Sequence, residues 1–246
     1  MMAAAFRELG LDWRYLKLPV SPELFAETVR GLPGSGYRGV NVTVPHKLAA
    51  LVLADQASDA ADAIGAANTL TFDQRSSLIA DNTDAGGFLD ALGESPRGRR
   101  ALVLGAGGAG RAVAWALREA GAEVSIWNRT PERSAAVARE LGVGQVEAPQ
   151  PSDLLVNATS VGLDAGTGDA DPLNTLGIAA LDPPPVVVDL VYGDRATPVQ
   201  VWGERAGAQV VEGIEVLVRQ GARSLERWTG REAPVDTMRA AARHSA

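Results

Sequence analysis

The sequence predicts an α/β fold in two parts, of which the second is a doubly wound parallel sheet covered by helices on both faces. Two observations carry this prediction. After residue 98, short apolar runs alternate strictly with helical segments, which is typical of strands that are buried on both faces of a parallel sheet. Just before it, residues 94–98 form a polar segment containing Pro96 and Gly98, which we expect to link the two parts.

The first part mixes helices with strands. A helix start is marked at Ser21 by an N-capping hydroxyl followed by Pro22 in the first turn, and Gly31 marks the end of the same helix. In chain order we expect a helix at 1–9, a strand at 13–18, a helix at 21–31, a strand at 39–43, a helical stretch at 49–63 in one or two pieces, strands at 68–72 and 78–82, and a helix at 84–92.

The second part repeats the order strand, helix, strand. In chain order we expect strand 101–104, helix 108–119, strand 123–127, helix 131–141, strands 154–157, 186–191 and 209–211, and two closing helices at 214–228 and 235–242.

Composition excludes several classes of function. The chain has 23 basic and 30 acidic residues, a net charge of −7, so a nucleic acid or an anionic membrane is a poor partner. Without cysteine and with two histidines, it offers no thiolate or histidine cluster for a metal. No apolar run reaches the ~18 residues of a membrane span, and Arg7 and Glu8 interrupt any signal peptide. We therefore expect a cytoplasmic protein, a monomer or homodimer, that acts on a small molecule.

A glycine-rich turn lies between the strand at 101–104 and the following helix. Residues 105–110 read Gly-Ala-Gly-Gly-Ala-Gly and match the G-x-G-x-x-G pattern of a Rossmann-type dinucleotide site. The glycines let the backbone approach a pyrophosphate, and the helix N-terminus offers free N–H groups with a partial positive charge. The alternative is an ordinary tight turn. The predicted cofactor contacts here are Gly105, Gly107, Gly108, Ala109 and Gly110.

The end of the next strand favours NADP over NAD. An NAD site usually places an acidic residue there to hold the ribose 2′-hydroxyl. This chain instead has Asn128, Arg129 and Thr130, with Arg133 one helical turn further on. Two cations without a carboxylate suit a 2′-phosphate. Alternatively Thr130 only caps the helix that begins at Pro131, and both roles can coexist because capping leaves the arginine side chains available.

One of the two lysines of the chain, both in the first part, is a candidate for proton transfer. Of the 23 basic residues, 21 are arginines, and Lys47 and Lys17 are the two lysines. Arginine cannot release its proton near neutral pH, whereas lysine can when its surroundings favour the neutral amine. Lys47 ends a strand-and-turn segment, residues 39–47. The alternative is a surface lysine in the first turn of a helix.

Several further segments, in order and spacing, resemble the shikimate dehydrogenase family over essentially the whole chain. They are residues 39–47, 65–69, 81–87, 105–110, 157–162, 188–192 and 213–220. The resemblance implies a reversible hydride transfer between NADP(H) and shikimate or 3-dehydroshikimate, a step of aromatic amino acid biosynthesis. It also implies a substrate domain of residues 1–97, with the C-terminal helices of 214–246 packing back on it, and an NADP domain of residues 98–213.

The resemblance also implies a role for individual residues. Lys47 and Asp84 correspond to the catalytic pair. The residues implied in substrate binding are Asn41, Thr43, Asn68, Tyr192 and Gln220. Those implied at the cofactor, besides the glycine-rich turn and the 128–133 segment, are Thr159, Ser160, Val191 and Gly213. The chemistry asks for such a set independently, since hydride transfer to a carbonyl needs a proton donor at the developing alkoxide.

Alternatives stay open at single residues and for the whole chain. Asp84 could be the N-cap of the helix that follows it, and His46 could be a solvated neighbour of Lys47. A quinate/shikimate or aminoshikimate dehydrogenase is one alternative function, and a non-catalytic paralogue that binds nucleotide or metabolite is another. The family begins with a strand and a Ser-x-Ser segment that holds the substrate carboxylate, whereas Met1–Phe6 matches the helix after it. We therefore expect the chain as written to bind shikimate poorly, and its natural start to lie upstream.

Overall fold

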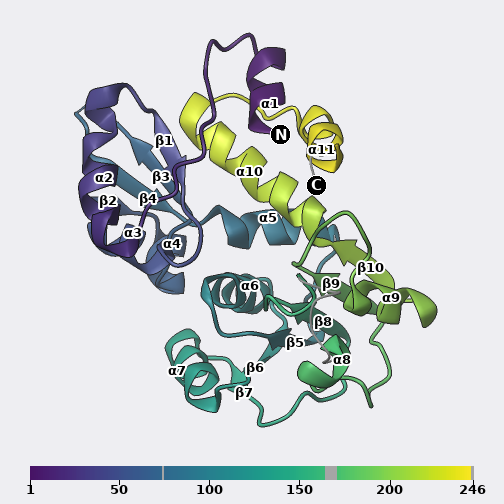
Figure 1. Ribbon diagram of the computed structural model, residues 1–246. Helices are drawn as coiled ribbons and strands as arrows, with labels where there is room; N and C mark the ends of the chain where they lie inside the picture. Colours follow the sequence, from purple (N-terminus) through teal and green to yellow (C-terminus); the bar gives the residue numbers. More distant parts are fainter. Residues whose placement is uncertain (74, 164–170, 245–246) are drawn as a thin grey trace. The chain divides into compact units, whose positions relative to one another are not determined.

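The computed structural model describes residues 1–73, 75–163 and 171–244 of an α/β protein (Figure 1). The chain forms two compact units, one of Met1–Gly87 with the residues from Val218 onward and one of Phe88–Leu217. The changes of unit fall inside two continuous helices, α5 (Thr83–Leu92) and α10 (Gly213–Thr229). The domain limits at 97/98 and 213/214 stay predictions. Among the described residues, no helix combines the length and the apolar character that a membrane crossing requires.

The described residues of the first unit contain a four-stranded mixed sheet. Its strand order is β1 (Gly39–Asn41), β3 (Thr69–Phe72), β4 (Leu78–Asp81) and β2 (Gln56–Ala57). β1 and β4 run antiparallel to β3, and β2 runs parallel to β4. Thr69 pairs with Asp81 in the β3–β4 ladder, so the residues that flank these two strands, Asn68 and Asn82, come to the same end of the sheet.

The alternation of side chains along β3 separates a core face from a polar face. Leu70 and Phe72 are buried in the apolar core beneath α2 (Phe25–Gly31), α3 (Lys47–Leu53) and α4 (Asp59–Ile64). Thr69 points the other way, to α10. Trp228 of α10 donates its indole N–H to the Leu70 carbonyl at 3.1 Å. In this unit α1 (Met2–Glu8) packs beside α11 (Val235–Arg243), so the first and the last helix of the chain are neighbours (Figure 1).

The second unit is a doubly wound parallel sheet, as expected. In its described residues the strand order is β10 (Gln209–Glu212), β9 (Val186–Asp189), β8 (Leu154–Asn157), β5 (Arg100–Leu104), β6 (Glu123–Trp127) and β7 (Gly144–Gln145). Every pairing is parallel. The order reverses between β5 and β8, and doubly wound sheets usually bind their ligand at such a switch point, outside the carboxyl ends of the strands.

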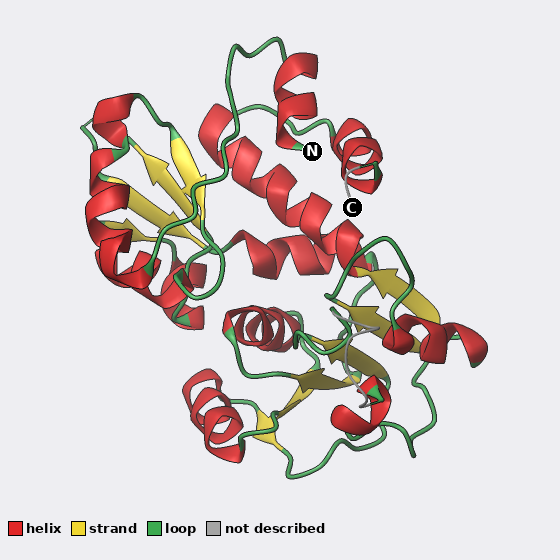
Figure 2. Ribbon diagram, in the orientation of Figure 1, coloured by secondary structure: helices red, strands yellow, loops and turns green. Residues whose placement is uncertain are grey.

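Helices cover both faces of this sheet. α6 (Gly108–Glu119) and α7 (Pro131–Leu141) pack together on one face, and α8 (Pro172–Thr175) and α9 (Pro198–Arg205) pack together on the other (Figure 2). The core on the α8 and α9 side is formed by Leu102, Leu104, Leu155, Leu176, Ile178, Val187 and Val199. Burial on both faces explains why the strands read as continuous apolar runs.

Several predicted elements differ from the structure. The strand expected at 13–18 is wrong: residues 11–21 have no regular secondary structure, and none of the described strands pairs with them. β-branched and aromatic residues favour an extended chain, but a strand exists only when it is paired. The stretch at 49–63 forms two helices, α3 and α4, with the short strand β2 between them. The short elements β7, α8 and α9 were not predicted.

A buried carboxylate joins three segments at the carboxyl end of the second sheet. Asp189, the last residue of β9, is fully buried, and its partners among the described residues are neutral. Its carboxylate accepts from Asn157 Nδ2 at 2.9 Å, from the Val191 backbone N–H at 3.1 Å and from the Thr197 hydroxyl. Burial raises the pKa of the Asp189 carboxyl, and the three donated hydrogen bonds oppose this shift only in part.

Asp189 should therefore make stability fall with rising pH. Because the folded-state pKa lies above the ordinary value of 3.8, the native state binds more protons than the unfolded state between the two values. The free energy of unfolding of the wild type, relative to the isosteric Asp189→Asn variant, is expected to be highest below about 3.8 and to decrease as the pH rises through the raised pKa. Urea unfolding at a series of pH values measures this difference.

Asp153 provides the matched control with the opposite sign. The hydrogen bond from the Arg100 side chain lowers the pKa of the Asp153 carboxyl. The wild type relative to Asp153→Asn should therefore lose stability as the pH falls through that lowered value. A difference between wild type and Asp189→Asn that stays flat, or that grows with pH, would contradict the account of Asp189.

Candidate functional site

A close ion pair stands at the polar end of the first unit. Lys47 is the first residue of α3, and Asp84 lies in the first turn of α5. The Lys47 Nζ and Asp84 Oδ2 atoms are 2.7 Å apart, and the two side chains are 14% and 18% exposed. Partial burial reduces screening by water, and the bond is charge-assisted, so this pair is stronger than an ordinary surface ion pair.

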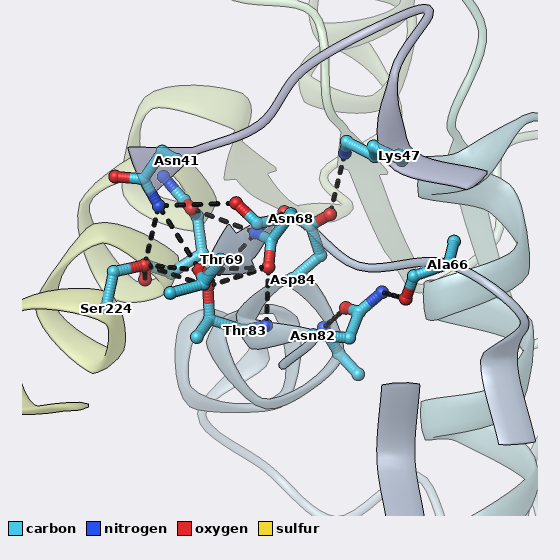
Figure 3. Close-up of polar contacts among 11 residues, drawn as sticks. Asn41, Lys47, Ala66, Asn68, Thr69, Asn82, Thr83, Asp84 and Ser224 are labelled. Atoms are coloured by element: carbon cyan, nitrogen blue, oxygen red, sulfur yellow. Dashed lines mark hydrogen bonds and ion pairs between the residues drawn. The ribbon is translucent and has the colours of Figure 1, made fainter. Parts of the chain in front are cut away.

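Asp84 is free to face Lys47 because another residue caps the helix. The Asn82 side-chain oxygen accepts from the Ala85 backbone N–H at 3.3 Å, which is the bond that an N-cap makes. The two oxygens of Asp84 instead meet Lys47 Nζ and, at 2.8 Å, Asn68 Nδ2 (Figure 3). The alternative that Asp84 acts as the N-cap is therefore not what the structure shows.

Asn68, just before β3, orients the carboxylate. Its side chain is 2% exposed, and its Oδ1 accepts from the Thr83 backbone N–H at 2.7 Å. Its Nδ2 donates to Asp84 and, at 3.2 Å, to Gln220 Oε1 on α10. α10 comes this close because Gly87 has no side chain: a Cβ there would lie 2.4 Å from the Gln220 backbone nitrogen. Lys47, Asn68, Asp84 and Gln220 thus meet in one place.

The remaining residues predicted for the substrate lie outside this group. Asn41 donates to the Ser224 hydroxyl at 2.8 Å and to the Thr69 hydroxyl at 3.2 Å, in a cluster of hydroxyl groups next to Asn68. Thr43 is exposed, and its carbonyl accepts from the His46 backbone N–H at 2.9 Å. Tyr192 is 42% exposed and belongs to the second compact unit.

His46 is not the solvated neighbour that its place beside Lys47 suggests. Its ring is partly buried, stacks on Phe25 with centroids 4.6 Å apart and planes at 3°, and places Nε2 2.9 Å from the Val20 carbonyl. Because a carbonyl can only accept, Nε2 carries the proton. His46 thereby ties the start of α3, and so the backbone of Lys47, to the segment before α2.

In the second unit, the glycine-rich turn stands at the switch point between β5 and β8. Gly105 has φ +108°, and a Cβ there would lie 2.9 Å from the Ala158 carbonyl oxygen. A Cβ at Gly110 would lie 1.9 Å from the Gly105 carbonyl oxygen, so only glycine lets α6 start this close to β5. By contrast, a Cβ at Gly107, the N-cap of α6, would meet nothing within 4 Å. The turn therefore combines crowded glycines on the protein side with open space at the helix N-terminus, which fits a pyrophosphate.

A cavity of about 160 Å³ lies next to this turn. It is lined by Trp127, Asn128, Arg129, Thr130, Arg133, Thr159, Ser160, Val161, Thr175 and Leu176. Among these described residues none is acidic and two are cationic, as a 2′-phosphate requires. Thr130 occupies the N-cap position of α7 without a side-chain capping bond, so its hydroxyl is not used there. Asn128 connects cavity and turn, because its Oδ1 accepts from the Ala106 backbone N–H at 3.2 Å.

The other predicted cofactor residues lie at the carboxyl ends of β8, β9 and β10. Thr159 donates its hydroxyl to Asn157 Oδ1 at 2.7 Å, which shapes the turn that carries Ser160. Asn157 is in turn bonded to Asp189, which also holds the backbone of Val191. Gly213 starts α10, where a Cβ would lie 2.5 Å from the Leu190 carbonyl oxygen. Asp189, which sequence reasoning missed, thus connects two of these segments with each other and with Thr197 at the start of α9. In the described residues, no group of three or more His, Asp or Glu side chains is placed to hold a metal ion.

Comparison with known proteins connects both units to one family. Residues 1–70 match a family model described as the shikimate dehydrogenase substrate binding domain, residues 90–161 one described as shikimate/quinate 5-dehydrogenase, and residues 213–243 one described as the shikimate 5′-dehydrogenase C-terminal domain.

Relatives match over nearly the full chain. The shikimate dehydrogenase (NADP(+)) of Methanothermobacter thermautotrophicus is 43% identical over 97% of this chain and 88% of its own, and that of Methanopyrus kandleri is 43% identical over 98% and 88%. The solved structure of shikimate 5-dehydrogenase from Thermus thermophilus, in complex with NADP(H) and shikimate, is 40% identical and superposes with a TM-score of 0.88, covering 100% of this chain and 93% of that one. The chain therefore belongs to the shikimate dehydrogenase family.

Proposed function

We propose that this chain is a shikimate dehydrogenase that catalyses the reversible reduction of 3-dehydroshikimate to shikimate with NADPH, in aromatic amino acid biosynthesis. The observation that carries the proposal is the Lys47–Asp84 ion pair at 2.7 Å, with Asn68 and Gln220 beside it. The relative from Thermus thermophilus, solved with NADP(H) and shikimate, supports the same reading.

Lys47 is the proton donor and acceptor in this proposal. Bound NADPH supplies a hydride to the carbonyl carbon of 3-dehydroshikimate. The carbonyl oxygen then gathers negative charge, and the Lys47 ammonium donates a proton to it. In the reverse direction the neutral Lys47 amine accepts the proton of the substrate hydroxyl. Arginine would fail in this role because it keeps its proton.

Asp84 holds the Lys47 amine in position through their hydrogen bond. Asn68 donates to the other oxygen of the Asp84 carboxylate. The carboxylate is therefore held at both oxygens, and this fixes the position of the Lys47 amine. We assign substrate binding to Asn41, Thr43, Asn68, Tyr192 and Gln220 within or beside a domain of residues 1–97 and 214–246. These side chains are neutral and polar, which suits the ring hydroxyl groups of shikimate.

NADP is the cofactor in this proposal, held by the domain of residues 98–213. The N-terminus of α6 receives the pyrophosphate, and the cavity with Arg129 and Arg133 receives the 2′-phosphate of the adenosine. Val191, Gly213 and the turn at Thr159 and Ser160 border the rest of the cofactor. The two arginines favour NADP, and so they disfavour an NAD-linked quinate/shikimate enzyme. The intact Lys47–Asp84 pair favours an enzyme over a non-catalytic paralogue. We place the enzyme in the cytoplasm as a monomer or homodimer.

Replacing Lys47 should abolish most of the activity. Lys47→Ala is expected to lower kcat for shikimate oxidation by two or more orders of magnitude, the usual scale for a general acid–base group. NADP binding should be unchanged. Lys47→Arg should do little better than Lys47→Ala. Lys17→Ala, at the exposed second lysine, is the control and should retain wild-type rates. The readout is NADPH formation with shikimate; an active Lys47→Arg enzyme would mean that Lys47 supplies only charge.

Replacing Arg129 should weaken NADP binding and spare NAD binding. A hydrogen bond to a charged group contributes roughly 1.5–3 kcal/mol, so Arg129→Ala should raise the Kd for NADP about ten- to hundredfold. The Kd for NAD should change little, because NAD lacks the 2′-phosphate. Arg139→Ala, at an exposed arginine of α7 outside the cavity, is the matched control. Calorimetric titration with both nucleotides measures this, and an equal loss for NAD and NADP would refute the assignment.

A further inference from the structure

Three hydroxyl groups from different elements meet next to the ion pair. They belong to Thr69 on β3, Thr83 at the start of α5 and Ser224 on α10 (Figure 3). The Thr69 and Ser224 oxygens are 2.9 Å apart, and each is 3.1 Å from the Thr83 oxygen. The three residues are at most 3% exposed. We refer to Thr69, Thr83 and Ser224 as the hydroxyl triangle.

The triangle is not explained by stability alone. Buried hydroxyl groups that satisfy one another contribute little net stability, and an apolar replacement of the same shape can be nearly neutral. A closed polar network does specify one arrangement of its members, because each bond fixes the direction of the next. Within the described residues every buried side-chain nitrogen and oxygen has a hydrogen-bond partner, so this network is complete.

The triangle connects two amide side chains. Asn41 Nδ2 donates into it, to Ser224 at 2.8 Å and to Thr69 at 3.2 Å. On the other side, the Thr69 and Thr83 hydroxyls both reach Asn68 Oδ1 at 3.2 Å. The Asn68 amide nitrogen also donates to the Thr83 hydroxyl at 3.0 Å, so both ends of the Asn68 amide contact the triangle.

Two partners of fixed polarity, the Thr83 backbone N–H and the Asp84 carboxylate, select one orientation of the Asn68 amide. Its oxygen end receives the Thr83 backbone N–H at 2.7 Å and lies 3.2 Å from the Thr69 and Thr83 hydroxyl oxygens. Its NH2 end must then face the Asp84 carboxylate, which can only accept. The flipped amide would place oxygen against carboxylate and NH2 against N–H, and both contacts would be repulsive.

Ser224 is the member of the triangle that connects α10 to the two threonines. It lies four residues after Gln220, and its hydroxyl reaches the Gln220 backbone carbonyl at 3.0 Å. The Gln220 side chain accepts from Asn68 at 3.2 Å. One serine therefore links the helical turn of Gln220 with Asn41 and with the two threonines.

We propose that Ser224 is a positioning residue: through the hydroxyl triangle it holds the Asn68 side chain in the place from which the amide donates to Asp84, and so holds the Lys47–Asp84 pair and Gln220 in one geometry. This inference rests on the proposed function for its kinetic consequence. Ser224 itself acts only through its neighbours.

The kinetic test compares two helix hydroxyls. Ser224→Ala should lower kcat/KM for shikimate about tenfold, the effect of about one hydrogen bond, and leave the KM for NADP unchanged. Thr229→Val is the matched control: its hydroxyl makes the same bond to the carbonyl four residues earlier, at 2.8 Å from the Leu225 oxygen, but lies outside the triangle. It should leave both parameters as in the wild type. Equal kinetics in Ser224→Ala and wild type, or equal losses in the two variants, would overturn the proposal.

A second measurement does not depend on activity. Hydrogen exchange of the Asn68 side-chain NH2, followed by NMR, should be slow in the wild type and in Thr229→Val. In Ser224→Ala it should be about tenfold faster, since a loss of about 1.4 kcal/mol opens the network tenfold more often. Equal exchange in all three proteins would overturn the positioning role. A wild type without shikimate dehydrogenase activity but with this exchange pattern would refute the proposed function and leave the positioning role standing.

Discussion

The hydrogen-bonded ion pair between Lys47 and Asp84 is the interaction on which the geometry of the polar site in the first unit depends. The two residues are 37 positions apart, and they meet only because the β3–β4 hairpin returns the chain to the end of the sheet where α3 begins. A carboxylate with lysine as its single partner would rotate. Here Asn68 holds the second oxygen, and the hydroxyl triangle holds Asn68, so the position of one amine nitrogen is set by bonds from three secondary-structure elements.

The site in the second unit depends on backbone groups and arginines instead of an ion pair. A large anionic cofactor needs backbone and cations, so the glycines at 105 and 110 bring backbone close to backbone, and the arginines line a cavity with no acidic residue among its described lining. Behind that surface, Asp189 gathers neutral donors from three segments instead of a cation. Burial of the Asp189 carboxylate is unfavourable for its charge. In return, Asp189 holds these turns together with neutral donors, so that Arg129 and Arg133 are available to the ligand.

The sequence predicts those site residues whose type is unusual at their position, and it does not predict those whose role depends on which elements pack beside them. Lys47 stands out because arginine replaces lysine almost everywhere else, and the arginines at 129 and 133 stand out because an acid is expected there. The network of Ser224 could not be read, since a serine four residues after Gln220 is an ordinary helical position until β3 and α5 come beside it. β2 and β7 have two residues each, too few for a periodic pattern. α9 is different, because its capping box of Thr197 and Gln200 is a sequence signal for a helix start.

The central claim is that Lys47 and Asp84 act as one unit, and a double-mutant cycle on kcat tests it most directly. If the pair acts as a unit, removing the second residue after the first costs little, so the Lys47→Ala/Asp84→Ala enzyme should be about as slow as the slower single variant, with a coupling of about 2 kcal/mol or more. Cofactor binding in all four proteins checks that the second unit is intact. Strictly additive losses in the double variant would contradict the account, because they would mean that the two groups act independently.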